Sequence, residues 1–72
     1  MQLTSRQYNL LERAVTEGRR IVVFRRGSEF IVRPESIGLR AGREAIETVQ
    51  PATGDSMTIY IDDMDDFEVV GD

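Results

Sequence analysis

The amino-acid sequence predicts a mainly β domain with one N-terminal α-helix, in which five short strands form a small antiparallel barrel. Three observations lead to this fold class. Apolar residues recur at helical spacing only in residues 5–17, just before Gly18. After Gly18, short β-branched or aromatic runs alternate with turns rich in Gly, Pro and Asp. With 72 residues the chain can build only one core, so we expect a single domain over residues 1–72.

The helix is expected over residues 5–17. Thr4 is a suitable N-cap, and Gln7 stands three residues later, which is the spacing of a capping box. Gly18 suits the left-handed conformation in which helices commonly end. The apolar stripe of the helix consists of Leu10, Leu11, Ala14 and Val15.

Strands are expected within residues 20–70. The apolar runs are 21–24, 30–33, 45–49, 57–61 and 67–70, with a bend or a further short strand at 37–39. Pro34 should end the second run, because proline cannot donate to a strand ladder. The run 21–24 is apolar on both faces, so we expect the sheet interior on one side and the helix on the other. Residues 25–28, 51–55 and 62–66 have turn composition.

The composition argues against an enzyme and against a metal site. The chain has no cysteine and no histidine, so it lacks thiolate ligands, disulfides and the usual general base. Its serines have no histidine to activate them. The acidic turn 62–66 differs from a calcium loop, because Met64 occupies an alternate ligand position and no glycine follows before Gly71. We therefore expect no catalytic residue, no metal and no cofactor.

The sequence also bears on location and assembly. No run approaches the roughly 20 apolar residues that span a bilayer. Residues 1–6 lack the basic end and apolar stretch of a signal peptide. We expect a cytoplasmic protein without membrane contact. A core this small leaves little margin over chain entropy, and without disulfides or metal the remaining common reinforcement is self-association, which predicts a homo-oligomer.

Charge is divided along the chain. Residues 1–43 carry nine arginines and four glutamates, for a net charge of +5. Residues 44–72 carry nine carboxylates and no basic residue, for a net charge of −9. Guanidinium groups suit phosphate oxygens. The candidate residues for binding a ligand or a nucleic acid are Arg19, Arg20, Arg25, Arg26, Arg33 and Arg43.

These arginines have two alternative roles. They can pair with the acidic half of the same chain, which the net charge of −4 favours over non-specific attraction to nucleic acid. Alternatively, the basic face of one copy can meet the acidic face of the next, giving a head-to-tail ring or chain.

Several segments carry a resemblance to a known family. They are Gly18-Arg19-Arg20, Ile21-Val22-Val23-Phe24-Arg25, Pro34, Gly42-Arg43, Gly54, Thr58-Ile59-Tyr60-Ile61-Asp62 and Phe67-Glu68-Val69-Val70. With them, the stretch from Leu10 to Val70 resembles the WYL domain, a bacterial regulatory module with an Sm-like, SH3-type barrel. Other single-domain Sm-like proteins resemble the chain nearly as well, and some of those form oligomers by pairing edge strands.

The resemblance implies an Sm-like barrel with a binding or regulatory role, but the chain departs from the family at two places. Glu44-Ala45-Ile46 stands where the family has its Trp-Tyr-Leu, and Asp63 stands where an arginine commonly follows the late strand. Both departures remove ligand-binding features, so nucleotide sensing is not carried over. Arg25 and Arg33 remain as positions that the resemblance places near an anion.

Two functional hypotheses follow. In the first, the chain is a non-catalytic binding or regulatory module that binds nucleic acid or another anionic ligand through an arginine-rich face. This hypothesis requires the arginines to converge on one exposed face without carboxylate partners. In the second, the chain is a protein-interaction or self-assembling barrel with no small ligand, and its arginines and aspartates form pairs within or between molecules.

Overall fold

A computed structural model, which describes residues 1–71, confirms the predicted fold class. The elements are α1 (Ser5–Glu17), β1 (Ile21–Arg25), β2 (Ser28–Arg40), β3 (Arg43–Val49), β4 (Ser56–Tyr60), the short 3-10 helix η1 (Ile61–Asp63) and β5 (Asp66–Val69). The five strands form one antiparallel sheet in the order β4-β3-β2-β1-β5. Within residues 1–71, no helix is both long and apolar enough to cross a membrane.

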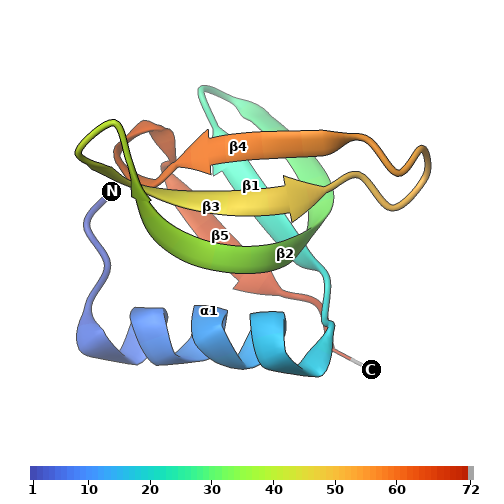
Figure 1. Ribbon diagram of the computed structural model, residues 1–72, viewed down its shortest axis with the longest axis horizontal. Coiled ribbons are helices and arrows are strands. Elements are labelled where there is room, and N and C mark those ends of the chain that lie inside the picture. The colour runs from blue at the N-terminus through green and yellow to red at the C-terminus, as the bar shows by residue number, and fades with distance from the viewer. Residues whose placement is uncertain (72) are drawn as a thin grey trace.

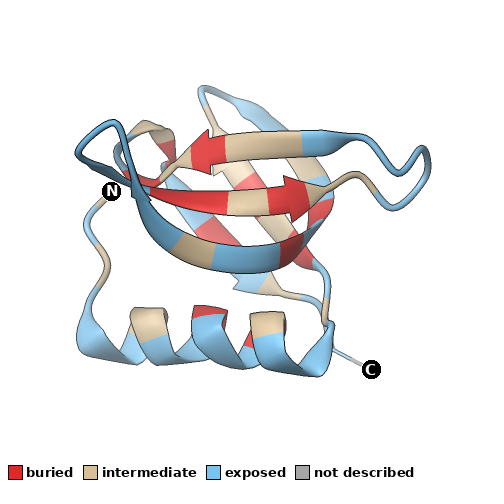
Figure 2. Cartoon of the chain, viewed as in Figure 1, coloured by how far each residue is buried: buried red, intermediate tan, exposed pale blue. Residues whose placement is uncertain are grey.

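The sheet is strongly curved around its own core, and α1 lies below it (Figure 1). β3 and β4 lie in front of β1 and β5 in this view, and each of these strands contributes residues to the buried core (Figure 2). Ile21, Val23, Ile46 and Ile59 are fully buried there. Because side chains alternate along a strand, the residues between them point outward.

The helix closes the core from the inner side of the sheet, which corrects one expectation. Leu11 and Ala14 are fully buried and belong to the same cluster as Ile21 and Val23. The prediction that α1 covers the opposite side of residues 21–24 is therefore wrong. The outward residues of β1 are only half-buried, and Ile31, which pairs with Val22, is 49% exposed. The outer face of β1 and β2 thus keeps an accessible apolar surface.

The predicted helix boundaries are confirmed. Thr4 accepts a hydrogen bond from the backbone N–H of Gln7 at 3.1 Å, and the Gln7 Oε1 accepts one from the backbone N–H of Thr4 at 2.9 Å. These two bonds form the capping box and satisfy donors that the first helical turn leaves unpaired. Gly18 ends the helix with φ at 68°.

The second strand differs from its prediction, because Pro34 does not end it. β2 continues to Arg40 and includes residues 37–39. Its first half pairs with β1 and its second half with β3, and the register shifts between Pro34 and Ser36. Proline is tolerated at such a bulge, where the regular ladder is interrupted. One bent strand therefore replaces the two shorter ones. At the end of β4, Ile61 begins η1 instead of continuing the strand.

Candidate ligand-binding site

The structure separates the six candidate arginines into three places. Arg19, Arg20 and Arg33 belong to the end of the sheet where β1 begins, Arg25 and Arg26 to the turn between β1 and β2, and Arg43 to the start of β3. Arg20 directly precedes β1 and Arg25 is its last residue, so the two arginines are separated by the length of this strand. The chain therefore has no single face that gathers all six.

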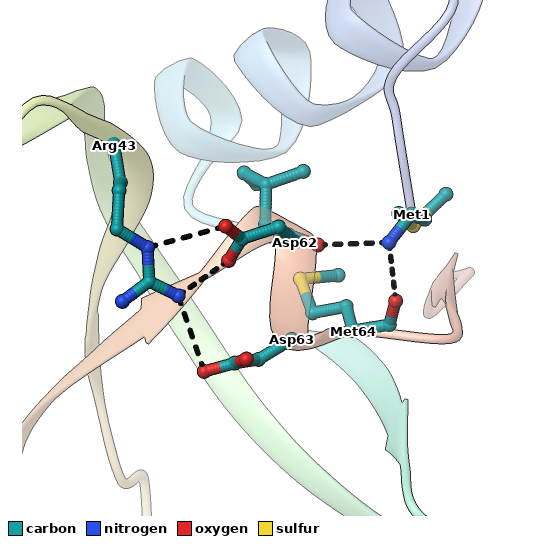
Figure 3. A network of polar contacts seen from close by, with 6 residues as sticks. Met1, Arg43, Asp62, Asp63 and Met64 are labelled. Carbon is teal, nitrogen blue, oxygen red and sulfur yellow. Dashed lines mark hydrogen bonds and ion pairs between the residues drawn. The ribbon is translucent and has the colours of Figure 1, made fainter.

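Arg43 is occupied by the acidic half of the chain (Figure 3). Its guanidinium donates two hydrogen bonds to Asp62, at 3.1 and 2.6 Å, and lies 3.5 Å from Asp63. It also lies over the ring of Tyr60, 4.0 Å from the centroid. The bonds from Arg43 lower the pKa of the Asp62 carboxyl below its ordinary value.

Figure 3 also shows how the neighbouring η1 turn is held. The amino group of Met1 donates to the carbonyl oxygen of Ile61 at 3.2 Å and to that of Met64 at 2.7 Å. Arg43 and Met1 thus contact the same turn from two sides. At this corner of the molecule the charge of Arg43 is paired with Asp62 and Asp63, which makes Arg43 less suited to a phosphate than an arginine without an ion pair.

Arg19 and Arg33 each have an acidic neighbour. The Arg19 Nε donates to the Glu17 Oε1 at 2.6 Å, and this bond is the main reason that the pKa of Glu17 is lowered. The Arg33 Nη2 lies 3.8 Å from the Glu35 Oε2, which is too long for a hydrogen bond. Arg33 therefore keeps donors that its neighbour does not use.

Arg25 and Arg26 occupy the tip of the β1–β2 hairpin. The Arg25 guanidinium lies 5.3 Å from the centroid of the Phe30 ring, within the range of a cation–π contact. Arg26 has φ at 51°, and its backbone N–H donates to the Asp65 Oδ2 at 2.9 Å. Neither side chain forms an ion pair with another of residues 1–71.

Arg20 has the surroundings that best suit a ligand. Its side chain is exposed and forms no ion pair within the described part of the chain. It lies at a shallow, open hollow with a volume of about 410 Å³. We call this feature the Arg20 hollow, and its lining residues are Arg20, Ile31, Gln50, Pro51 and Ala52.

One wall of the Arg20 hollow is a loop held by its own backbone. The carbonyl oxygen of Gln50 accepts hydrogen bonds from the N–H groups of Gly54 at 2.8 Å and Thr53 at 3.3 Å. The Gln50 N–H donates to the carbonyl oxygen of Asp55 at 2.8 Å. Gly54 has φ at 79°, a conformation that glycine adopts without strain. The wall is therefore formed before any ligand arrives.

The side chain of Gln50 contains a buried acceptor without a hydrogen bond among the described residues. Its side-chain Oε1 is buried and accepts no hydrogen bond from any of residues 1–71. A buried acceptor without a donor is unfavourable, because it has lost water and gained no partner. The Arg20 hollow therefore combines one cation that has no ion pair within residues 1–71 with apolar surface from Ile31, Pro51 and Ala52, and the buried Gln50 Oε1 adds no accessible acceptor to it.

Sequence reasoning named Arg20 but missed Ile31 and Gln50. The sequence did contain a sign that Ile31 is exposed. Alternate residues of a strand point to the same side, so Ile31 shares a face with the charged residues Glu29 and Arg33. Residues 51–55 were correctly expected to form a loop. Nothing in the sequence pattern, however, brought that loop beside β1 and β2.

The chemistry of the Arg20 hollow must be inferred from its own residues. No protein-family model matches the chain, and no curated protein sequence matches it either. Within residues 1–71, no three acidic side chains are grouped closely enough to hold a metal ion. The lining offers hydrogen bonding and apolar contact, and it contains no nucleophile with an adjacent base. This arrangement suits binding.

Proposed function

We propose that this chain is a non-catalytic binding module whose ligand is anionic and is held by Arg20. The observation that carries the proposal is the exposed Arg20 guanidinium, which has no ion pair within residues 1–71 and lies at a preformed hollow. Guanidinium groups form strong paired hydrogen bonds with carboxylate and phosphate oxygens. A ligand with such a group would supply the partner that the chain does not.

The strand register supports the same proposal. Ile21 pairs with Val32, so Arg20 and Arg33, which adjoin these two residues in the sequence, belong to the same end of the β1–β2 ladder. Like charges directly opposite one another on neighbouring strands destabilise a sheet. Arg33 gains little relief from Glu35, whose carboxylate lies 3.8 Å away. An anion bound at this end of the sheet would add negative charge where the chain places these two arginines.

The same facts favour a compact anion over a long nucleic acid. The net charge of the chain is −4, which opposes general attraction to a polyanion. Arg43 is already neutralised by Asp62, and Arg25 lies at the far end of β1 from Arg20. A continuous track of free arginines along one face is thus missing from the described residues, and binding of single-stranded nucleic acid becomes one outcome of the test below.

The test is a titration of the protein, followed by the backbone amide signals in nuclear magnetic resonance. The probes are inorganic phosphate, acetate and a short single-stranded oligonucleotide at low salt. We expect shifts at Arg20 and Gln50 that weaken as salt is added, because salt screens exposed charges. Arg20→Gln should abolish them. Arg6→Gln is the matched control, since Arg6 is exposed on α1 and also forms no ion pair within residues 1–71.

Three results would overturn this function. The first is that no anion moves the signals of Arg20 at low salt. The second is that Arg6→Gln weakens binding as much as Arg20→Gln does. The third is a shift map centred on Arg25 and Arg26, which would move the anion site to the hairpin tip. Strong binding of the oligonucleotide alone would assign the module to nucleic acid.

A second candidate function is assembly through the edges of the sheet. β4 and β5 each have one side without a strand partner among residues 1–71. Natural edge strands usually carry charge or proline that discourages pairing with another chain. β5 contains Asp66 and Glu68, whereas β4 contains neither a charged residue nor a proline. The uncharged edge of β4 is the observation that favours a protein partner or a second copy.

Light scattering tests this second candidate. Assembly predicts a mass that is a multiple of 8.2 kDa and that decreases in Ser56→Lys, which places a charge on the edge of β4. Gln2→Lys adds the same charge outside the sheet and should leave the mass unchanged. A monomer at every concentration removes the self-assembling version.

A further inference from the structure

We propose that the outer face of β1, β2 and β5 binds the same face of a second copy of this chain. The two copies are related by a two-fold axis that lies in the interface and passes through Ile31. This inference goes beyond the proposed function and needs no anion. It uses the face of the sheet and so differs from assembly through the edge of β4. Because Ile31 also lines the Arg20 hollow, the second copy would cover part of that hollow.

The centre of this outer face is apolar and accessible. Ile31 is 49% exposed, and it pairs with Val22, whose side chain is half-buried. Pro51 and Ala52 line the hollow beside Ile31 and are exposed as well. An apolar centre with a charged rim is the usual arrangement of a protein–protein interface. Covering Ile31 would remove apolar surface from water, which favours association.

Charges of opposite sign lie on the two sides of Ile31 along β2. Glu29 and Arg33 are both exposed, and each stands two residues from Ile31. Since alternate residues of a strand point to the same side, these three side chains share the outer face, with about 7 Å between successive ones. Within residues 1–71, Glu29 forms no ion pair, and the nearest carboxylate to Arg33 is that of Glu35 at 3.8 Å. Both charges are therefore available to a partner.

The neighbouring strands add charge of the same sign at each end. Phe24 of β1 pairs with Glu29 on one side and with Asp66 on the other, so two carboxylates lie at one end of the face. Arg20 directly precedes β1 at the opposite end, to which Arg33 also belongs. One end of the outer face is therefore acidic and the other basic, with the apolar centre between them.

This order of charges makes the outer face complementary to itself. A two-fold axis perpendicular to β2 places Ile31 of one copy opposite Ile31 of the other. Glu29 of each copy then lies opposite Arg33 of the other, which gives two ion pairs at equal distances from the axis. A contact in which both copies use the same surface closes as a dimer. Charge complementarity of this kind selects the partner, and a second copy already carries the matching pattern.

Sedimentation equilibrium with single charge reversals tests this arrangement. The unaltered chain should approach twice 8.2 kDa as its concentration rises. Glu29→Arg and Arg33→Glu each place like charges opposite one another, so each should weaken the dimer by about tenfold or more. Glu12→Arg and Arg6→Glu are the matched controls, because both residues are exposed on α1 and form no ion pair within residues 1–71.

Combining the two reversals gives a sharper measurement. In a chain that carries both Glu29→Arg and Arg33→Glu, each pair is restored with its signs exchanged, so the dimer should return. An equimolar mixture of the two single variants should form a mixed dimer, because one copy then has two arginines at these positions and the other has two glutamates. If a substitution merely damaged its own chain, mixing would restore nothing.

The apolar centre is tested by a charge at Ile31. Ile31→Lys brings two lysines together on the axis and should leave the chain monomeric. Leu39→Lys is the matched control, because Leu39 is 76% exposed and lies in the half of β2 that pairs with β3. Ser56→Lys, at the edge of β4, should also leave this dimer unchanged.

Glu68 gives a prediction of the opposite sign. It pairs with Val22, which in turn pairs with Ile31, so Glu68 lies level with the axis and approaches Glu68 of the other copy. Like charges that face each other oppose association. Glu68→Gln should therefore tighten the dimer by a fewfold, whereas Glu12→Gln should not. An unchanged affinity in Glu68→Gln would contradict an axis through Ile31.

The outcomes separate this inference from the two functions proposed above. A chain that stays monomeric but still binds phosphate at Arg20 overturns the dimer and leaves the anion-binding function intact. A dimer that Ser56→Lys abolishes and Glu29→Arg leaves unchanged moves the contact to the edge of β4. A mass above that of a dimer overturns the two-fold arrangement. Failure of both the double variant and the mixture to restore the dimer overturns the pairing of Glu29 with Arg33.

Discussion

The arginines of this chain differ in function because their neighbours differ. Arg43 donates two hydrogen bonds to Asp62 and lies over Tyr60, so its charge is used within the molecule. Arg20 has no such neighbour within residues 1–71 and lies at a hollow that can accept a ligand. Both side chains are arginines and are equally able to bind an anion. Their neighbours in the fold decide which of the two is available to a partner.

A single residue, Ala41, also makes the turn between β2 and β3 less stable than it could be. Ala41 has φ at 54°, a left-handed conformation that is unfavourable for alanine but well tolerated by asparagine. We expect Ala41→Asn to stabilise the protein by about 0.5–1 kcal/mol, measured by urea unfolding. Ala52→Asn is the control, because Ala52 is exposed and has no positive φ. Equal effects of the two substitutions would contradict this explanation.

At the scale of secondary-structure elements, the sequence predicted features that depend on neighbouring residues, and it did not predict features that depend on strand pairing between distant residues. The bounds of α1 follow from Thr4, Gln7 and Gly18, which act within one turn of the helix. β2 was mispredicted because its continuation past Pro34 depends on a change of partner from β1 to β3. The candidate site was found only in part for the same reason, since Gln50 and Arg20 line one hollow because of the sheet order and not because they are close in the sequence.

The start of α1 gives a prediction at this scale. Thr4→Ala removes the side-chain oxygen that accepts from Gln7 and should destabilise the protein by about 1 kcal/mol in urea unfolding. Thr16→Ala provides the control, because Thr16 is exposed within the helix and makes no capping bond. A loss in Thr16→Ala as large as that in Thr4→Ala would show that the cap is not responsible.

For the whole molecule, folding joins the two differently charged parts of the chain. β3 begins in the basic part and continues into the acidic part, so Arg40 of β2 meets Glu47 of β3, and Arg43 of β3 meets Asp62 of η1. Other pairs, such as Arg13 with Glu17, stay within the basic part. The division of charge in the sequence is therefore only partly kept on the surface, because part of the basic half is paired with the acidic half.

This arrangement predicts how stability depends on pH. The chain has no histidine, so no side chain of that type titrates between pH 5.5 and 7. Hydrogen bonds from Arg43 lower the pKa of Asp62, and bonds from Thr58 and Arg40 lower the pKa of Glu47. A carboxyl whose pKa is lower in the folded state stabilises that state above its ordinary unfolded pKa of about 4, and this contribution is lost as pH falls through the folded value.

The melting temperature of the tag-free protein, followed by circular dichroism, should accordingly be flat between pH 5.5 and 7 and should fall below about pH 4.5. Glu47→Gln removes one of the responsible carboxyls, so its melting temperature should fall less steeply in acid than that of the unaltered protein. Glu44→Gln is the matched control, since Glu44 is exposed and forms no ion pair within residues 1–71. A loss of stability between pH 7 and 5.5, or an acid profile flattened equally by both substitutions, would show that the arginine-bonded carboxyls do not control the transition.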